Sequence, residues 1–400
     1  MKIIFIADVP LENPTSGSEQ VLHQQAIGLS LQGMDVYAIT RQKDQPKWII
    51  RTLKGIQGGT YCASEQDMIR AFISLACYPS KFYKRFKKNM PFQAVVSHQP
   101  FTCFSLLVAR KLLNIPMIYV LHSPSHEEYL LSHENESWLK NLLHIKARRM
   151  IERFCLQRSN KIMALSHYME QKVKEIHRIP ADRIVVNPGG VDLDLFKPPQ
   201  NRRLLKKELG FLESKIHLLT VRNLEPRMGL DNLIKCIHIL KKEKIEVHLI
   251  IGGEGVEREK LESLIKELDL VDEITMTGFI PIDMLHHYYG ASDFFVLPTR
   301  KLEGFGLVTP ESMACGTPVL GTPVGGTKEI LSDFDSQFLF RDTSSETMAD
   351  GIRLALENYF TDKKKYKELR LRCREYAEKN YSWKQHIDQL KSILEGIISV

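Results

Sequence analysis

This 400-residue chain contains two successive sets of short β-branched segments, and within each set these segments alternate with longer helical ones. That alternation is typical of parallel sheets whose strands are joined by crossover helices. The expected strands are 2–7, 36–40, 94–97, 117–121, 161–165 and 183–186 in the first set, and 216–221, 247–251, 274–277, 294–297 and 318–321 in the second. The sequence therefore predicts an α/β fold with two Rossmann-like, doubly wound domains, each binding ligands at the carboxyl ends of its strands.

The boundary between the two domains is predicted in the segment 187–199, NPGGVDLDLFKPP, where glycines and prolines interrupt both periodicities. We therefore expect an amino-terminal domain over 1–190 and a carboxyl-terminal domain over 191–383. The last helix, about 384–400, has apolar residues at helical spacing and must pack on a partner surface. We expect it to cross back to the amino-terminal domain, so that the two domains face each other across a cleft.

Composition and charge restrict the compartment and the partners. The 7 cysteines are odd in number and scattered, without CxxC spacing, which favours a reducing compartment and argues against a zinc site. No signal peptide is expected after Lys2, and no apolar run reaches the roughly 20 residues of a membrane span. We therefore expect a cytoplasmic protein. Its first 190 residues hold 25 Lys and Arg against 15 Asp and Glu, which favours an anionic partner.

One segment that could contact an anionic partner is 78–88, in which Lys and Arg are interleaved with aromatic residues. Such a segment is compatible with a peripheral position on an anionic membrane surface, or with contact to a phosphorylated acceptor. A solvated basic helix with buried aromatic side chains explains the pattern equally well. No motif supports a nucleic-acid partner.

The most informative residues for chemistry are Glu303 and Glu311, which flank a glycine-containing loop and the start of a helix after the strand 294–297. Glycines allow close backbone approach to a ligand, and a helix amino terminus offers free N–H groups to a phosphate. The two carboxylates can accept hydrogen bonds from hydroxyl groups. A phosphate flanked by two polyols is a nucleotide sugar, whereas the alternative is a glycine-rich loop with two solvated glutamates.

The segment EGFGLVTPESMACGTPVLGTPVGGTKEI, 303–330, resembles the donor-site signature of the retaining glycosyltransferases of family four, the group 1 glycosyltransferases, which have the GT-B fold. In that family the first glutamate contacts the donor sugar and the second the ribose, which implies these roles for Glu303 and Glu311. The resemblance also implies metal-independent transfer to a hydroxyl acceptor (a glycan, a lipid-linked glycan or a small molecule), without a cofactor. It implies that the domain 1–190 binds the acceptor and that the domain 191–383 binds the nucleotide sugar. Donor contacts through the intervening backbone are expected at Gly304, Phe305, Gly306 and Leu307.

The resemblance extends over nearly the whole chain. Gly17 and Ser18 stand in a segment similar to the family's loop at the donor diphosphate. His98 and His122 each follow a predicted strand, and His122 resembles the histidine near the donor sugar, whereas His98 is expected on the acceptor side. For a single histidine at such a place, a structural hydrogen bond is as good an explanation as a functional role.

Two weaker family matches lie in the second half of the chain. Gly253 corresponds to the family's glycine turn, and Phe279 to the segment whose backbone meets the nucleotide base. Asp192-Leu193-Asp194 is a DxD sequence, the metal motif of a different glycosyltransferase fold, but its position in the linker favours a structural role. We therefore expect no metal ligand. A UDP-linked or GDP-linked sugar is favoured over an ADP-linked one.

One segment departs from the family pattern. The family has an arginine and a lysine where this chain has Asn223 and Met228, in the alignment that matches Gly229. Basic residues stand one place earlier, at Arg222 and Arg227. We expect Arg227, helped by Arg222, to stabilise the departing diphosphate, because the planar guanidinium suits phosphate oxygens. Asn223 is expected beside the donor.

Two other functions remain open from the sequence. A sugar-nucleotide epimerase uses the same double-Rossmann architecture and needs no acceptor. A weakly active partner subunit that binds nucleotide sugar would account for Asn223 and Met228 in place of basic residues. A nicotinamide-dependent dehydrogenase is disfavoured, because no G-x-G-x-x-G motif follows the first strand.

Overall fold

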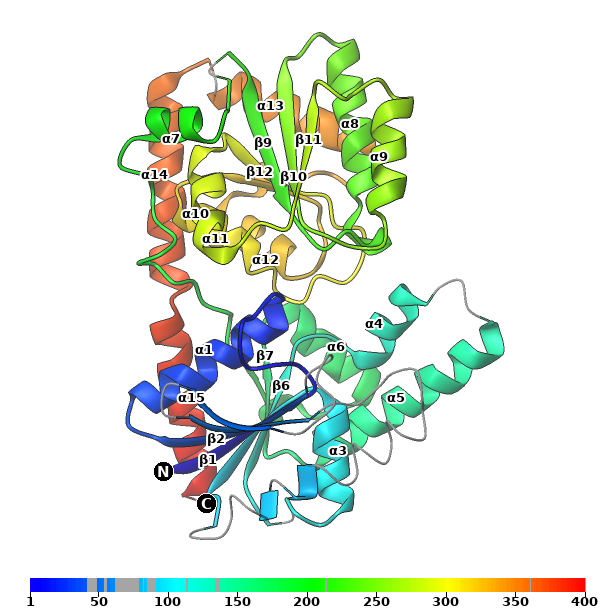
Figure 1. Ribbon diagram of the computed structural model, residues 1–400, viewed down its shortest axis with the longest axis vertical. Helices are drawn as coiled ribbons and strands as arrows, with labels where there is room; N and C mark the ends of the chain where they lie inside the picture. The colour runs from blue at the N-terminus through cyan, green and yellow to red at the C-terminus, as the bar shows by residue number, and fades with distance from the viewer. Residues whose placement is uncertain are drawn as a thin grey trace. The chain divides into compact units, whose positions relative to one another are not determined.

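The computed structural model of the chain describes residues 1–41, 49–53, 56–61, 79–81, 83–84, 91–112, 114–133, 137–212, 214–359 and 361–399 (Figure 1). Contacts divide the chain into two compact units. Unit 1 consists of Met1–Gly189 together with Trp383–Val400, and unit 2 consists of Gly190–Ser382. Each unit is an α/β structure built around its own sheet.

Unit 1 contains an eight-stranded sheet of order β3-β4-β2-β1-β5-β6-β7-β8, in which β3 alone runs antiparallel to its neighbour. Its strands are β1 Lys2–Ala7, β2 Asp35–Arg41, β3 Ile49–Leu53, β4 Ile56–Tyr61, β5 Ala94–His98, β6 Met117–Leu121, β7 Lys161–Ala164 and β8 Ile184–Val186. The flanking helices are α1 Gly17–Leu31, α3 Pro100–Val108, α4 Ser125–Ser132, α5 Trp138–Arg158, α6 His167–His177 and α15 Trp383–Ile398. The sequence did not predict β3 and β4, because these short segments at the sheet edge lack a clear apolar period.

Unit 2 contains a fully parallel five-stranded sheet of order β11-β10-β9-β12-β13. Its strands are β9 Ile216–Val221, β10 Val247–Gly252, β11 Ile274–Gly278, β12 Phe294–Leu297 and β13 Val319–Gly321. The helices are α7 Arg202–Glu208, α8 Leu230–Lys242, α9 Arg258–Glu267, α10 Ile282–Ala291, α11 Val308–Ala314, α12 Gly325–Asp335, α13 Ser345–Tyr359 and α14 Lys363–Asn380. All the strands expected from the sequence are present in both units, which confirms the predicted α/β class with two parallel sheets.

The last helix, α15, packs within unit 1 against α1 (Figure 1). A Cβ atom placed on Gly28 of α1 would lie 2.0 Å from Cδ1 of Ile387, so only glycine permits this approach of the two helices. Leu390 and Leu394 are buried on the same face of α15. The apolar spacing in this helix therefore reflects its contact with α1.

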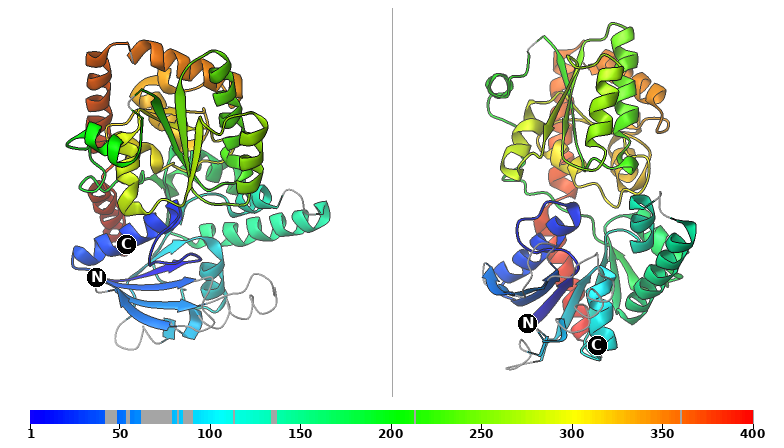
Figure 2. Two further views of the ribbon diagram at one scale, coloured as in Figure 1. Left: turned by 45° about the horizontal axis from the view of Figure 1, so that its top comes forward. Right: turned by 45° about the vertical axis from the view of Figure 1, so that its right-hand side comes forward.

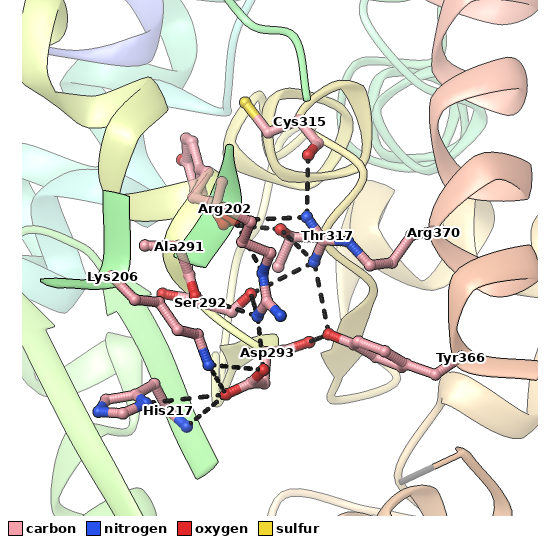
Figure 3. Close-up of polar contacts among 12 residues, drawn as sticks. Arg202, Lys206, His217, Ala291, Ser292, Asp293, Cys315, Thr317, Tyr366 and Arg370 are labelled. Carbon is pink, nitrogen blue, oxygen red and sulfur yellow. Dashed lines mark hydrogen bonds and ion pairs between the residues drawn. The ribbon is translucent and has the colours of Figure 1, made fainter. Parts of the chain in front are cut away.

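A buried ionic cluster secures the amino end of β12 in unit 2 (Figure 3). The carboxylate of Asp293 accepts hydrogen bonds from Lys206 at 2.9 and 3.0 Å, from Arg202, and from the backbone N–H of His217 at 2.8 Å. The hydroxyl of Tyr366 donates to the carbonyl oxygen of Asp293 at 2.7 Å. The cluster ties α7 and α14 to the edge of the sheet opposite to the strands' carboxyl ends.

Within the described ranges, no helix is long and apolar enough to cross a membrane. Most of the basic and aromatic segment 78–88 lies outside the described residues, so the expectation attached to it stays a prediction.

Candidate functional site

The carboxyl ends of the parallel strands of unit 2 bring several expected site residues to one edge of the sheet. Arg222 follows β9, Gly253 follows β10, Phe279 follows β11, and the loop that contains Glu303 follows β12. Phe279 is 56% exposed there. This edge is where doubly wound sheets bind their ligands.

Arg222 and Glu303 form a buried ion pair at this edge. The Nη2 of Arg222 also donates to Oγ1 of Thr299 at 3.3 Å and approaches the sulfur of Met228 at 2.9 Å. Its Nε is buried without a hydrogen-bond partner among the described residues. The guanidinium of Arg222 therefore lies beside Met228, the residue that stands where the family pattern places a lysine, and its Nε–H donor is unused.

Two glycines make this arrangement possible. Gly325, at φ +58°, begins α12, and a Cβ on it would lie 2.0 Å from the carbonyl oxygen of Glu303. Gly253 has φ +125°, and a Cβ there would lie 1.8 Å from the carbonyl oxygen of Arg222. Both are backbone contacts in conformations that side chains disfavour. The N–H of Gly326 donates to the carbonyl of Glu303 at 3.0 Å, which fixes the loop on α12.

Arg227 makes different contacts. Its Nε donates to Glu225 at 2.9 Å, and its Nη1 donates to the carbonyl oxygen of Leu302 at 2.8 Å. The backbone N–H of Arg300 donates to the carbonyl of Arg227 at 2.8 Å. Arg227 thus joins its own turn to the loop before Glu303, whereas Asn223 is exposed.

Glu311 lies in the first turn of α11 and is buried, where the hydroxyl of Tyr289 donates to its Oε2 at 3.1 Å. Burial raises the pKa of Glu311 to about 7, against the smaller, lowering effect of that hydrogen bond. Because no cation pairs with it among the described residues, this carboxyl can change its protonation state when a ligand binds.

The loop from Gly304 to Leu307 leads directly into α11, and Gly306 takes φ +82°. Phe305 is buried and meets the ring of Tyr381 edge-on, with the centroids 5.7 Å apart. The loop is therefore anchored by a side chain while its backbone continues to the helix. The structure brings these residues next to Glu303, as the sequence order requires.

The remaining expected residues belong to unit 1. Gly17 and Ser18 form the first turn of α1, where Ser16 and Glu19 form a reciprocal capping box. His98 ends β5 and His122 follows β6, and their rings are joined by a hydrogen bond of 2.9 Å between His98 Nδ1 and His122 Nε2. The two histidines are thus one hydrogen-bonded unit.

Two residues that sequence reasoning missed complete this unit. His98 Nε2 lies 3.1 Å from Oε1 of Gln25 in α1, and Nε2 of Gln25 lies 2.8 Å from Nε2 of His386 in α15. Gln25, His98 and His386 are all buried. The signal in the sequence was a polar residue on the apolar face of α1 and another on that of α15. No motif distinguishes these two residues from other buried polar residues.

The DxD sequence of the linker forms a local turn. The carboxylate of Asp192 accepts hydrogen bonds from the backbone N–H groups of Asp194 and Leu195, both at 3.1 Å. In the part of the chain that the structure describes, no group of three or more His, Cys, Asp or Glu residues is placed to hold a metal ion.

Both halves of the chain resemble known protein families. Residues 201–380 match the family model described as glycosyl transferases group 1, and residues 15–195 match the model described as glycosyltransferase family 4. The GDP-mannose-dependent alpha-(1-6)-phosphatidylinositol monomannoside mannosyltransferase of Mycolicibacterium smegmatis is 27% identical over 215 residues, covering 52% of this chain. The chain spans only 55% of that relative's length.

Two solved structures resemble the fold of the entire chain. Sucrose-phosphate synthase from Thermosynechococcus elongatus superimposes with a TM-score of 0.82 at 20% identity, with 100% of both chains covered. Anabaena HepE in complex with UDP and glucose gives a TM-score of 0.75 at 18% identity, covering 99% of this chain and 100% of the other. Since the two family models match both halves and these glycosyltransferase structures share the fold, the chain belongs to the group 1, or family four, glycosyltransferases of the GT-B class.

Proposed function

We propose that the chain transfers a sugar from a nucleotide-diphosphate sugar to a hydroxyl acceptor, with retention at the anomeric carbon and without a metal ion. The observation that carries the proposal is the buried pairing of Arg222 with Glu303 at the carboxyl edge of the unit 2 sheet. A cation and a hydroxyl-binding carboxylate are adjacent there. They suit a ligand in which a diphosphate is joined to a sugar.

The chemical difficulty is the departure of the diphosphate. The bond from the anomeric carbon to the diphosphate oxygen breaks while a bond to the acceptor oxygen forms on the same face, and the acceptor proton passes to a diphosphate oxygen. Donors directed at the developing negative charge lower this barrier, and one such donor is typically worth about 3–4 kcal/mol. We assign the role to Arg222, because its Nε–H is unused and its partner Glu303 can turn to the sugar, whereas Arg227 holds its own turn to the Leu302 carbonyl.

Glu303 and Glu311 bind hydroxyl groups in this proposal. Glu303 exchanges part of its contact with Arg222 for hydroxyls of the donor sugar, which frees Arg222 for the diphosphate. Glu311 accepts hydrogen bonds from the ribose. The proposed exchange is electrostatically balanced, because the diphosphate replaces one carboxylate as the partner of Arg222.

We favour a UDP-linked or GDP-linked donor. The Mycolicibacterium relative is named as GDP-mannose-dependent, and the Anabaena structure holds UDP and glucose. A thermal-shift screen of UDP-, GDP- and ADP-glucose and of GDP-mannose tests the choice, since a ligand at 100 times its Kd stabilises the folded state by about 2.7 kcal/mol. Stabilisation by ADP-glucose alone would contradict it.

The reaction itself is tested with the donor that binds and a panel of hydroxyl acceptors. Nuclear magnetic resonance of the product should show the anomeric configuration of the donor, in the presence of a metal chelator. An inverted product, or dependence on added metal, contradicts that part of the proposal. If the protein converts the nucleotide sugar to its epimer without an acceptor, its function is epimerisation and not transfer.

We also propose that this protein is cytoplasmic and acts at an anionic membrane surface, which it contacts through α5. The exposed face of this helix carries large apolar side chains, with 76% of Trp138, 55% of Leu139, 63% of Leu143 and 67% of Met150 accessible. Figure 2 shows α5 extending away from the unit 1 sheet. Exposed apolar residues in this number on one helix mark an interaction surface.

The charge of α5 supports anionic lipid as the partner of this face. Exposed Lys140, Lys146, Arg149 and Arg153 lie among the apolar residues, while the only carboxylate within α5, Glu152, is buried. A second copy of the same face would bring like charges together. Anionic lipid instead attracts each basic residue by about 1 kcal/mol near the surface, and it accommodates Trp and Leu at the headgroup boundary.

Flotation with phosphatidylserine-containing liposomes tests this contact. The double variant Lys146→Glu and Arg153→Glu should lose most of the bound fraction, and Trp138→Ser should lose part of it. Lys364→Glu with Lys367→Glu on α14 makes the same change in net charge and should bind like the wild type. Equal flotation of all four proteins, or equal binding to neutral phosphatidylcholine, removes the α5 proposal.

A further inference from the structure

A single chain of hydrogen bonds runs through the core of unit 1 from the end of β6 to α15. His122 Nε2 and His98 Nδ1 are 2.9 Å apart, His98 Nε2 and Gln25 Oε1 are 3.1 Å apart, and Gln25 Nε2 and His386 Nε2 are 2.8 Å apart. At the far end, Nδ1 of His386 lies 2.7 Å from the carbonyl oxygen of Pro188. These side chains come from four separate segments of the sequence.

The direction of every hydrogen bond in this chain follows from its last member. The carbonyl oxygen of Pro188 can only accept, so Nδ1 of His386 carries a proton. In a neutral imidazole the other nitrogen is then an acceptor, so His386 Nε2 receives the amide proton of Gln25. The Oε1 of Gln25 accordingly accepts from His98 Nε2, and His98 Nδ1 accepts from Nε2 of His122.

The neutral state of the three rings has two physical causes. His98 is completely inaccessible and His386 is 2% accessible, so a charged imidazolium would be desolvated. No carboxylate among the described residues stabilises a positive charge on any of the three. Burial lowers the pKa of His122 and of His386 to about 4 and that of His98 well below its usual range, and neighbouring histidines lower those of His98 and His122 further.

We propose that His98, Gln25 and His386 are positioning residues that hold His122 in the Nε2–H tautomer, so that its Nδ1 presents a lone pair to the ligand. Nδ1 has no hydrogen-bond partner among the described residues, and His122 is only partly buried. Such a nitrogen accepts a hydrogen bond from a hydroxyl group and repels the oxygens of a phosphate. The role for a donor-sugar hydroxyl rests on the proposed function.

The chain of hydrogen bonds also gives α15 a function beyond packing. His386 lies close after the start of α15 at Trp383, and Pro188 lies just before Gly189, the last residue of the first segment of unit 1. Asn187 strengthens this end, because its Nδ2 donates to the carbonyl of His386 at 3.0 Å. The tautomer of His122 therefore depends on residues from both ends of unit 1.

Nitrogen-15 spectroscopy of the histidine rings tests the inference on ligand-free protein. Long-range nitrogen–proton correlations distinguish the two neutral tautomers, and the His122 signals are assigned by their loss in His122→Phe. The wild type should show the Nε2–H form of His122 alone. His386→Phe and Gln25→Leu should each give a mixture of tautomers, whereas His167→Phe, which removes an exposed histidine of α6, should give the wild-type result.

Two outcomes would overturn the inference: an Nδ1–H tautomer of His122 in the wild type, or an unchanged Nε2–H tautomer in both His386→Phe and Gln25→Leu. Circular dichroism and thermal unfolding show whether these variants are folded. If Gln25→Leu does not fold, His386→Phe alone decides. If the His122 tautomer shifts in these variants but the protein transfers no sugar, the positioning role of the hydrogen-bond chain is supported and the proposed function is removed. The positioning role and the proposed function can therefore fail separately.

Monodeoxy donors test the hydroxyl contact. Removing the hydroxyl that binds His122 should lower kcat/KM by about tenfold in the wild type, the effect of one lost hydrogen bond. The same deoxy donor should lower it no further in His122→Phe. If removal of each hydroxyl in turn lowers kcat/KM as much in His122→Phe as in the wild type, His122 does not accept a hydrogen bond from a donor hydroxyl.

Discussion

Two buried carboxylates near opposite ends of β12 differ in how fully their surroundings satisfy them. Asp293, before the strand, has two cations and a backbone N–H as donors. Glu303, in the loop beyond the strand, is paired with Arg222 and Thr299, and Arg222 retains an unused Nε. Both carboxylate oxygens of Asp293 accept hydrogen bonds, although Nδ1 of the adjacent His217 is buried without one, whereas only Oε2 of Glu303 accepts among the described residues. The more complete pairing of Asp293 favours a structural role, and the less complete pairing of Glu303 favours ligand binding.

The largest expected effect is on stability. Asp293→Asn should lower the free energy of unfolding by about 3–5 kcal/mol, because Arg202 and Lys206 lose their counter-charge and face an amide that offers further donors. Glu303→Gln should lower it less, because one cation rather than two loses its counter-charge and the amide oxygen can still accept from Arg222. Urea denaturation measures both. Equal losses would mean that the two clusters do not differ as described.

The next effect is on catalysis. Arg222→Met should lower kcat by about 10²–10³-fold, because it removes the donor aimed at the diphosphate. The matched variant Arg202→Met removes an arginine from the Asp293 cluster, and it should reduce stability while leaving the kcat of the folded fraction unchanged. A greater loss of kcat in Arg227→Met than in Arg222→Met would return the leading role to Arg227.

A third difference concerns pH. The hydrogen bond from His217 and the charges of Arg202 and Lys206 outweigh burial and hold the pKa of Asp293 below its usual range, so its contribution is lost as pH falls. Burial raises the pKa of Glu311 to about 7. The folded state therefore binds this proton more tightly, and the contribution of Glu311 to stability is lost as pH rises from the unfolded-state pKa to about 7.

Glu311→Gln should remove that second pH dependence, worth at most about 3 kcal/mol from the size of the shift. Denaturation at pH 5 and pH 8 measures it. Hydroxyl donors favour the ionised carboxylate, so nucleotide binding near pH 7 should release protons in the wild type and not in Glu311→Gln. Calorimetry in buffers of different ionisation enthalpy detects this release, and identical proton release in both proteins would exclude Glu311 as its source.

The smallest effect is expected at an exposed ion pair. Arg353 of α13 contacts both carboxylate oxygens of Glu243, at 2.8 and 3.0 Å, but each side chain is about one third accessible. Arg353→Ala should change the free energy of unfolding by less than about 1 kcal/mol, because solvent screens the pair. Thermal unfolding provides the comparison with Asp293→Asn. If Arg353→Ala lowers the free energy of unfolding as much as Asp293→Asn does, burial does not explain the difference between the exposed pair and the Asp293 cluster.

The sequence determined most of the architecture by itself. The parallel strands of both sheets, apart from β4, were predictable because buried parallel strands are short, apolar and separated by helical periods. Glu303 and Glu311 were predictable as a pair because the loop and helix between them are local in sequence. The short strands β3 and β4 were not, since strand pairing at an edge depends on the neighbouring strand more than on the segment itself.

Only the tertiary structure decided which side chains meet. The sequence showed Arg222 and Arg227 one place before the family's basic positions, but the approach of the β12 loop directs Arg222 to Glu303 and Arg227 to the Leu302 carbonyl. Likewise, His98 and His122 were visible as strand-end histidines, whereas Gln25 and His386 join them across 361 residues of sequence. Periodicity is a local property of the chain, but the partner of a buried polar group is set by whichever distant segment packs against it.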